Sequence, residues 1–192
     1  ALSEREQSGQ GQYVDLALLD VTAATLANQA SNFLVGGRVP GRLGNAHPNI
    51  VPYQAFATAD GHCIVAVGND NQFRNFVNTL ELPDLADDPR FANNQARVEN
   101  RELLVPLLEA KMRERNRDDW LAALEAAGVP VGPINNVDEV FADPQVLARE
   151  MRVNIPHPDN PDLAVAGCPI KLSRTPVEYH RPPPKLGEHD DL

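Results

Sequence analysis

The chain has 192 residues, of which 42% are hydrophobic and 23% charged, a composition typical of a folded globular protein rather than a disordered chain. Its formal net charge of −10 disfavours nucleic acid and anionic membrane surfaces as partners. No apolar run approaches the roughly 20 residues that a membrane helix needs, and the N-terminus lacks a signal-peptide core, so we expect a cytoplasmic protein.

The first quarter of the chain is predicted to be helical and then irregular. Residues 1–7 have the polar character of the end of a helix, and because the first residue is Ala we expect a truncated chain. Apolar side chains recur at three- and four-residue spacings over residues 16–34, which predicts one long helix. Asp15 and Asp20 are suited to capping its start. Residues 36–53 hold four glycines and three prolines, which predicts a long loop.

The middle of the chain has clearer periodicity. Residues 54–58 and 63–67 predict a β-hairpin, in which Asp60 and Gly61 would supply turn positions with positive φ. Residues 71–80 predict an amphipathic helix with Asp70 as its N-cap. Two further helices are predicted over residues 94–115, with a bend at Pro106, and over residues 116–127.

The last third is predicted to contain short elements and then a proline-rich segment. Residues 129–134 are expected to be extended, and residues 136–141 and 144–150 to form two short helices. Prolines recur between residues 155 and 184, with strand-like runs at residues 163–166 and 170–172. This pattern indicates a segment that wraps over a surface.

The sequence shows no self-contained catalytic constellation. Gly9 and Gly11 lack the preceding strand and the third glycine of a dinucleotide-binding motif. The five histidines never occur at positions i and i+4 of one helix, so we expect no metal site. Ser173 and the other serines lack a GxSxG context, and Cys63 and Cys168 lack CxxC spacing.

Five strings in the sequence nevertheless resemble one family in the same order. They are GQGQYVDLALLD, GNAHPNIVPYQAFATADGHCIVAVGNDNQF, DDPRFANNQARVENR, VPVGPINNVDEVFADPQ and PPPKLGEHDDL. Together they resemble the C-terminal part of the CaiB/BaiF (family III) CoA-transferases, most closely the formyl-CoA and dicarboxylate members. The resemblance runs from Gly9 to Leu192.

The resemblance implies an α/β fold, with part of a large Rossmann-like domain and a small α/β domain. Residues 1–39 would end the large CoA-binding domain and form a linking helix. Residues 40–150 would form the small domain, and residues 151–192 would return to the large one. The complete protein would be an interlocked homodimer.

The resemblance also implies CoA transfer from an acyl-CoA thioester to a small carboxylic acid. Members of the family use an aspartate that forms an anhydride and then a thioester with CoA. That aspartate lies upstream of the GQGQYVD string, so we expect no catalytic residue in this chain, and capping accounts for Asp15 and Asp20. Coenzyme A is then a substrate, and no cofactor is bound permanently. The alternatives are an α-methylacyl-CoA racemase of the same family and a non-catalytic fragment or binding module.

One segment of this chain is expected to reach the substrate. In formyl-CoA transferases a glycine-rich loop closes over the reacting carbonyl, and Gly44, Asn45 and His47 occupy the matching place here. The GNAHPN sequence differs from that loop and is associated with dicarboxylate-handling relatives. A tight turn whose side chains satisfy local backbone groups is the alternative role for Gly44, Asn45 and His47.

Overall fold

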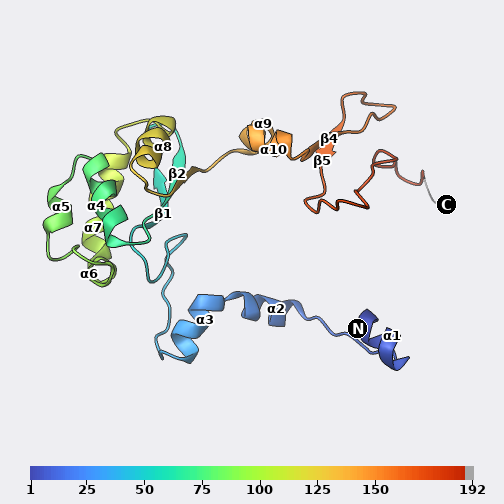
Figure 1. Cartoon of the computed structure of the whole chain (residues 1–192), viewed down its shortest axis with the longest axis horizontal. Coiled ribbons are helices and arrows are strands. Elements are labelled where there is room, and N and C mark those ends of the chain that lie inside the picture. Colours follow the sequence, from blue (N-terminus) through green and yellow to red (C-terminus); the bar gives the residue numbers. More distant parts are fainter. Residues whose placement is uncertain (189–192) are drawn as a thin grey trace. The chain divides into compact units, whose positions relative to one another are not determined.

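The computed structural model describes residues 1–188 (Figure 1). The chain forms two compact units, Ala1–Pro133 and Ile134–Leu192. The last four residues of the PPPKLGEHDDL string, including His189, lie outside the described residues. None of the helices within residues 1–188 combines the length and apolar character that crossing a bilayer requires.

The first unit contains a three-stranded antiparallel sheet. Its strands, in spatial order, are β1 (Tyr53–Ala57), β2 (His62–Ala66) and β3 (Val131–Pro133). The predicted hairpin is confirmed, but its turn is not of the predicted kind, because Gly61 does not have a positive φ. Instead a four-residue turn closes where the Thr58 amide donates to the Gly61 carbonyl at 2.9 Å.

Five helices lie between the hairpin and β3 in the chain. They are α4 (Asp70–Thr79), α5 (Asp84–Asp87), α6 (Asn94–Glu99), α7 (Arg101–Met112) and α8 (Arg117–Ala126). Helix α7 packs on β1, and α8 packs on β2 and β3 (Figure 1). Their apolar faces and the inward side of the sheet bury one core, which includes Phe56, Phe76, Leu108 and Trp120.

Two predicted helix features are displaced by a few residues. The N-cap of α4 is Asn69, whose side chain accepts from the Gln72 amide, and Asp70 is the first helical residue. The predicted helix over residues 94–115 is two helices that separate at Asn100. The Asn100 side chain donates to the Ala96 carbonyl at 2.9 Å and so ends α6, whereas Pro106 lies inside α7 on its exposed side.

The N-terminal segment holds α1 (Leu2–Ser8), α2 (Leu18–Thr25) and α3 (Ala27–Leu34). The prediction of one long helix over residues 16–34 is wrong, because the helix is interrupted at Ala27, which has a positive φ of 44°. Asp20 lies in the first turn of α2 as expected, but the N-cap is Ala17 and not Asp15. None of the three helices contains a buried residue.

The second unit holds the two predicted short helices, α9 (Val137–Ala142) and α10 (Pro144–Ala148). Strand β5 (Ala164–Ala166) confirms one strand-like run, and it pairs in antiparallel register with β4 (Arg152–Asn154). Residues 170–172 were also predicted to be extended, but they form no strand. The mixture of helices and strands in both units confirms the predicted α/β class.

Candidate functional site

The loop of residues 44–52 carries the three residues expected to reach the substrate, Gly44, Asn45 and His47. It starts with a turn in which the Ala46 amide donates to the Leu43 carbonyl at 3.0 Å. Gly44 has φ +59°, a left-handed conformation that favours glycine. A Cβ at Gly44 would meet no atom within 4 Å, so the backbone conformation and not crowding accounts for this glycine.

Asn45 ties the loop to the edge of the sheet. Its Oδ1 accepts a hydrogen bond from the Ala55 amide at 2.8 Å, and Ala55 belongs to the edge strand β1. An edge strand has backbone groups without ladder partners, and the amide side chain satisfies one of them. Within residues 1–188, the Asn45 Nδ2 group makes no hydrogen bond, and the side chain is exposed to solvent.

His47 is held on both its main chain and its ring. Its backbone amide donates to the Tyr53 carbonyl at 2.9 Å, and its ring stacks on the Tyr53 ring with centroids 5.4 Å apart. Nδ1 accepts from the Asn49 amide at 3.1 Å. Because Nδ1 is an acceptor, the neutral imidazole carries its proton on Nε2. The ring can therefore present an N–H donor on the side away from Asn49.

The opposite side of the loop is held by side chains that sequence reasoning did not single out. Arg101 Nη2 donates to the His47 and Pro48 carbonyls, at 3.0 Å each. Asn94 donates to the Asn49 carbonyl at 2.8 Å and accepts from the Val51 amide at 3.2 Å. Arg97 Nε donates to the Val51 carbonyl at 2.8 Å. We call Asn94, Arg97 and Arg101 the loop clamp.

A cavity of about 200 Å³ lies beside the loop. Pro48 and Asn49 of the loop and Arg101 of α7 line one part of it, and Gln29, Asn32 and Arg38 line another. Asn49 also donates to the Asn32 side chain at 3.4 Å. Two guanidinium groups therefore line a small cavity next to the loop in a chain that is strongly acidic as a whole. Arginine is well suited to binding carboxylates or phosphates.

A second hollow on the N-terminal segment is almost entirely apolar. It measures about 660 Å³ and is lined by Leu26 between α2 and α3, by Phe33 and Leu34 of α3, and by the adjoining Val39 and Pro40. The Gln29 side-chain oxygen is buried there and has no hydrogen-bond partner within residues 1–188. This hollow offers an apolar surface and no group that could take part in acid–base or nucleophilic chemistry.

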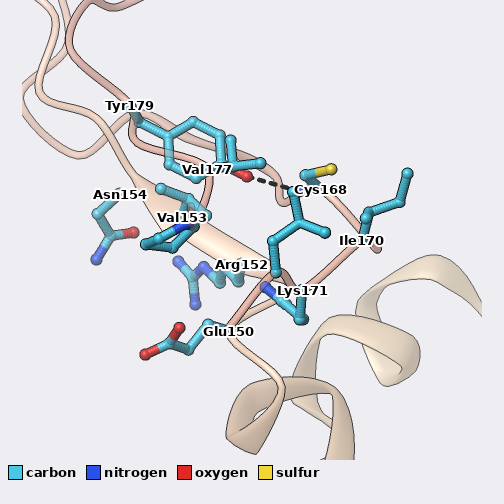
Figure 2. A pocket seen from close by; sticks show the side chains of 11 residues that line it. Glu150, Arg152, Val153, Asn154, Cys168, Ile170, Lys171, Val177 and Tyr179 are labelled. Atoms are coloured by element: carbon cyan, nitrogen blue, oxygen red, sulfur yellow. Dashed lines mark hydrogen bonds between the residues drawn. The ribbon is translucent and has the colours of Figure 1, made fainter. Parts of the chain in front are cut away.

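The second unit contains a pocket of about 400 Å³ around β4 (Figure 2). Arg152 and Lys171 supply positive charge, Glu150 negative charge, and Val177 an apolar wall. Figure 2 shows the Tyr179 hydroxyl accepting a hydrogen bond from the Cys168 backbone amide, at 2.6 Å. This hydrogen bond holds the segment that follows β5, so the role of Tyr179 here is structural.

Neither pocket chemistry nor spacing indicates a metal centre. Within residues 1–188, no three His, Cys, Asp or Glu side chains gather where they could hold a metal ion. Asp15 and Asp20 are exposed, and within residues 1–188 neither carboxylate forms a side-chain hydrogen bond or ion pair. The loop of residues 44–52 with its clamp is therefore the candidate site, and it offers hydrogen-bond donors and shape but no nucleophile.

Comparison with known proteins gives a consistent result. The sequence profile of CoA-transferase family III matches residues 1–190. The chain is 50% identical over 189 residues to a succinate–glutarate CoA-transferase of Agrobacterium fabrum, covering 98% of this chain and 47% of that protein. It is 39% identical to the human succinyl-CoA:glutarate CoA-transferase, covering 98% of this chain and 43% of that one.

A solved structure supports the fold in the same way. A CaiB/BaiF family protein from Brucella suis matches with a TM-score of 0.80 and 46% identity, over 98% of this chain and 48% of that chain. The chain thus spans about half the length of the relatives it matches.

Proposed function

The chain belongs to CoA-transferase family III, and we propose that the complete protein moves CoA from an acyl-CoA thioester to a free carboxylic acid. The observation that carries this proposal is the 50% identity to a succinate–glutarate CoA-transferase, which extends over 98% of this chain. Both curated relatives described above are named for glutarate. We therefore propose a dicarboxylic acid as acceptor and a dicarboxylic acyl-CoA, such as succinyl-CoA, as donor.

The proposed reaction uses the family's aspartate, upstream of the GQGQYVD string. Its carboxylate attacks the acyl-CoA carbonyl and expels the CoA thiolate, which leaves a mixed anhydride. The thiolate then attacks the aspartyl carbonyl, releases the donor acid and forms an aspartyl-CoA thioester. The acceptor carboxylate attacks that thioester to form a second anhydride, and the thiolate attacks the acceptor carbonyl. This last step frees the aspartate.

The role we propose for this chain is to cover and orient the reacting groups. Gly44 allows the tight turn, and Asn45 and His47 place an amide group and an imidazole N–H on the loop. Such donors could bind an oxygen of the anhydride or of the acid. Excluding water matters here because both intermediates are readily hydrolysed.

The arrangement of the complete protein belongs to the same proposal. Residues 1–39 would finish the large domain, residues 40–150 would form the small domain, and residues 151–192 would return to the large one. We propose an interlocked homodimer located in the cytoplasm, without a permanently bound cofactor. The apolar surface of α2 and α3, which contain no buried residue, is consistent with a segment that packs on a partner.

The test is a thioester exchange assay with the complete protein. Succinyl-CoA and glutarate are mixed with enzyme, and glutaryl-CoA and free succinate are measured by mass spectrometry. We expect one glutaryl-CoA for each succinyl-CoA consumed and little free CoA. A reaction without glutarate measures hydrolysis, and acetate in place of glutarate measures the preference for a second carboxylate.

Two outcomes would contradict the proposal. Deuterium uptake from solvent at the α-carbon of a 2-methylacyl-CoA, without any exchange of CoA, would indicate a racemase. Binding of acyl-CoA with neither reaction would indicate a binding module.

A further inference from the structure

The three residues of the loop clamp come from two consecutive helices. Asn94 and Arg97 lie three residues apart on one side of α6, and Arg101 begins α7 directly after the break at Asn100. Together they make five hydrogen bonds to main-chain atoms of the loop, at 2.8–3.2 Å. The contacts join residues that are more than forty positions apart in the sequence.

The loop needs such partners because its backbone N–H and C=O groups cannot all form hydrogen bonds with one another. Pro48 and Pro52 have no N–H group, so the segment between them cannot form a regular ladder. The carbonyls of His47, Pro48 and Val51 accept from arginine side chains instead. All hydrogen bonds between the clamp and the loop go to main-chain atoms of the loop. They therefore fix the path of the loop backbone and leave the loop side chains free of hydrogen bonds with the clamp.

The clamp is itself held rigidly. The Arg97 side chain has 0% exposure, and its guanidinium also donates to the Phe91 carbonyl at 3.0 Å and to Asp70 at 2.8 Å. It lies over the Phe73 ring, 4.4 Å from the centroid. A planar guanidinium with several fixed partners loses little further freedom when it binds a carbonyl. The loop is thus held on one side by β1, through Asn45, and on the other by side chains of α6 and α7.

We propose that Asn94, Arg97 and Arg101 are positioning residues for CoA transfer, which hold the loop backbone so that Gly44, Asn45 and His47 meet the acyl-CoA and the acid. The inference rests on the proposed function, because it assumes that this loop contacts substrate. Small displacements of positioned groups reduce rates strongly even when the chemistry is performed elsewhere. The clamp would then affect turnover without touching the reacting atoms.

Arg101 offers the most direct test, because within residues 1–188 its side chain donates hydrogen bonds to loop carbonyls alone, and because it is not fully buried. In the complete protein, Arg101→Gln should lower kcat/KM for thioester exchange by about tenfold to a hundredfold, as expected for loss of charge-assisted hydrogen bonds. Hydrogen exchange of the amides of residues 45–51 should become faster, with little change in melting temperature. Arg101→Lys should restore part of the activity, since it keeps the charge but lacks the planar fork.

Two companion variants sharpen the result. Asn94→Ala removes different bonds to the same loop and should give the same pattern of faster exchange and lower kcat/KM. Arg113→Gln is the matched control, because the exposed Arg113 follows α7 and its side chain pairs, within residues 1–188, with the Glu109 carboxylate alone, at 3.4 Å. It should behave like the unchanged protein in both measurements.

The proposal is overturned if Arg101→Gln leaves loop exchange and kcat/KM unchanged, or if activity falls only in proportion to the fraction of unfolded protein. Its failure can be separated from failure of the proposed function. If the unchanged complete protein does not transfer CoA, the proposed function fails. The exchange measurement still decides whether the clamp holds the loop.

Discussion

Arg97 is a fully buried cation whose partners are distributed over three segments of the chain. Its guanidinium donates to the Val51 and Phe91 carbonyls and to the Asp70 carboxylate, and it stacks on Phe73. A buried charge is expensive to desolvate, and it is tolerated here because its donors are paired with fixed acceptors. Removing it would leave the two carbonyls without a partner in the interior.

We expect Arg97→Met to lower the free energy of unfolding by about 2–4 kcal/mol, although methionine fills much of the volume. Arg74→Gln is the matched control, because Arg74 also pairs with an aspartate, Asp87 at 3.0 Å, but both side chains are exposed. That variant should change the free energy by less than about 1 kcal/mol. Urea denaturation compares the two, and equal effects would mean that burial of Arg97 contributes nothing.

Cys63 lies in β2 and is buried in the core, and its environment determines its reactivity. Burial raises the pKa of the Cys63 thiol to about 11, although the charge of Arg117 opposes part of the shift. The thiolate is the nucleophilic form of cysteine, and a thiol with this pKa is almost entirely protonated at neutral pH. Cys63 is therefore expected to be a structural residue, as a small apolar side chain would be.

Iodoacetamide should accordingly leave Cys63 unmodified in the folded protein at about pH 8 and label it in urea. Peptide mass spectrometry distinguishes it from Cys168, which is only partly buried and serves as the internal reference in the same sample. Labelling of Cys63 in the native protein at the rate of Cys168 would contradict the burial of the thiol.

The hairpin turn and the start of helix α8 are joined by one carboxylate, that of Asp60. Asp60 accepts from the Arg117 backbone amide at 2.7 Å and from the Thr58 hydroxyl at 3.1 Å. Asn116, the N-cap residue of α8, makes no capping hydrogen bond with its own side chain. Asp60 therefore caps a helix that begins far along the chain, and negative charge there also complements the helix dipole.

The Arg117 amide holds the pKa of the Asp60 carboxyl below its usual 3.8, and the Thr58 hydroxyl adds to this effect. A lowered pKa in the folded state means that the ionised carboxylate stabilises the fold above the unfolded pKa, and that this contribution is lost as the pH falls through the folded pKa. Asp60→Asn should thus unfold at lower urea concentration than the unchanged protein at neutral pH. The gap should close below about pH 4; a gap that is constant with pH would exclude the ionised cap.

Sequence periodicity was sufficient for the elements whose signals are local. The two strand-like runs of β1 and β2 flank Asp60 and Gly61, and α8 begins after the polar residue Asn116 and ends before Gly128, which has a φ of 71°. The break at Ala27 was not predictable, because no glycine or proline marks it. Nor could β4 be found, since three residues acquire strand geometry only through their pairing with β5.

The candidate site was predictable in its loop but not in its support. Gly44 is noticeable in a sequence because it occurs among prolines and other glycines, and Asn45 and His47 were found by resemblance. Asn94, Arg97 and Arg101 have helical spacing in the sequence, but ordinary solvated helices have the same spacing. Their partners in the loop are main-chain groups, which carry no side-chain signal, so only the folded chain shows that these residues hold the loop.

The main buried core is confined to the middle of the chain. The main cluster runs from Val51 to Val129, whereas α1, α2 and α3 bury no residue. The large apolar side chains exposed in that N-terminal segment include Leu18, Leu19, Leu34 and Val35. Contiguous apolar surface of this kind is rare on monomeric proteins and promotes association.

We therefore expect the 192-residue chain to self-associate through α2 and α3. Changing Leu19 and Leu34 to Gln together removes two exposed leucines without touching the core, and should weaken association on the order of a hundredfold if each contributes about 1.5 kcal/mol when buried. Leu186→Gln is the control, because Leu186 is fully exposed but lies outside this segment. Static light scattering over a range of concentrations measures the effect.

A compact monomer of the unchanged chain, or equal association of both variants, would mean that these leucines do not drive contact between copies. Self-association that depends on Leu19 and Leu34 but not on Leu186 would identify α2 and α3 as the surface through which copies of this chain meet.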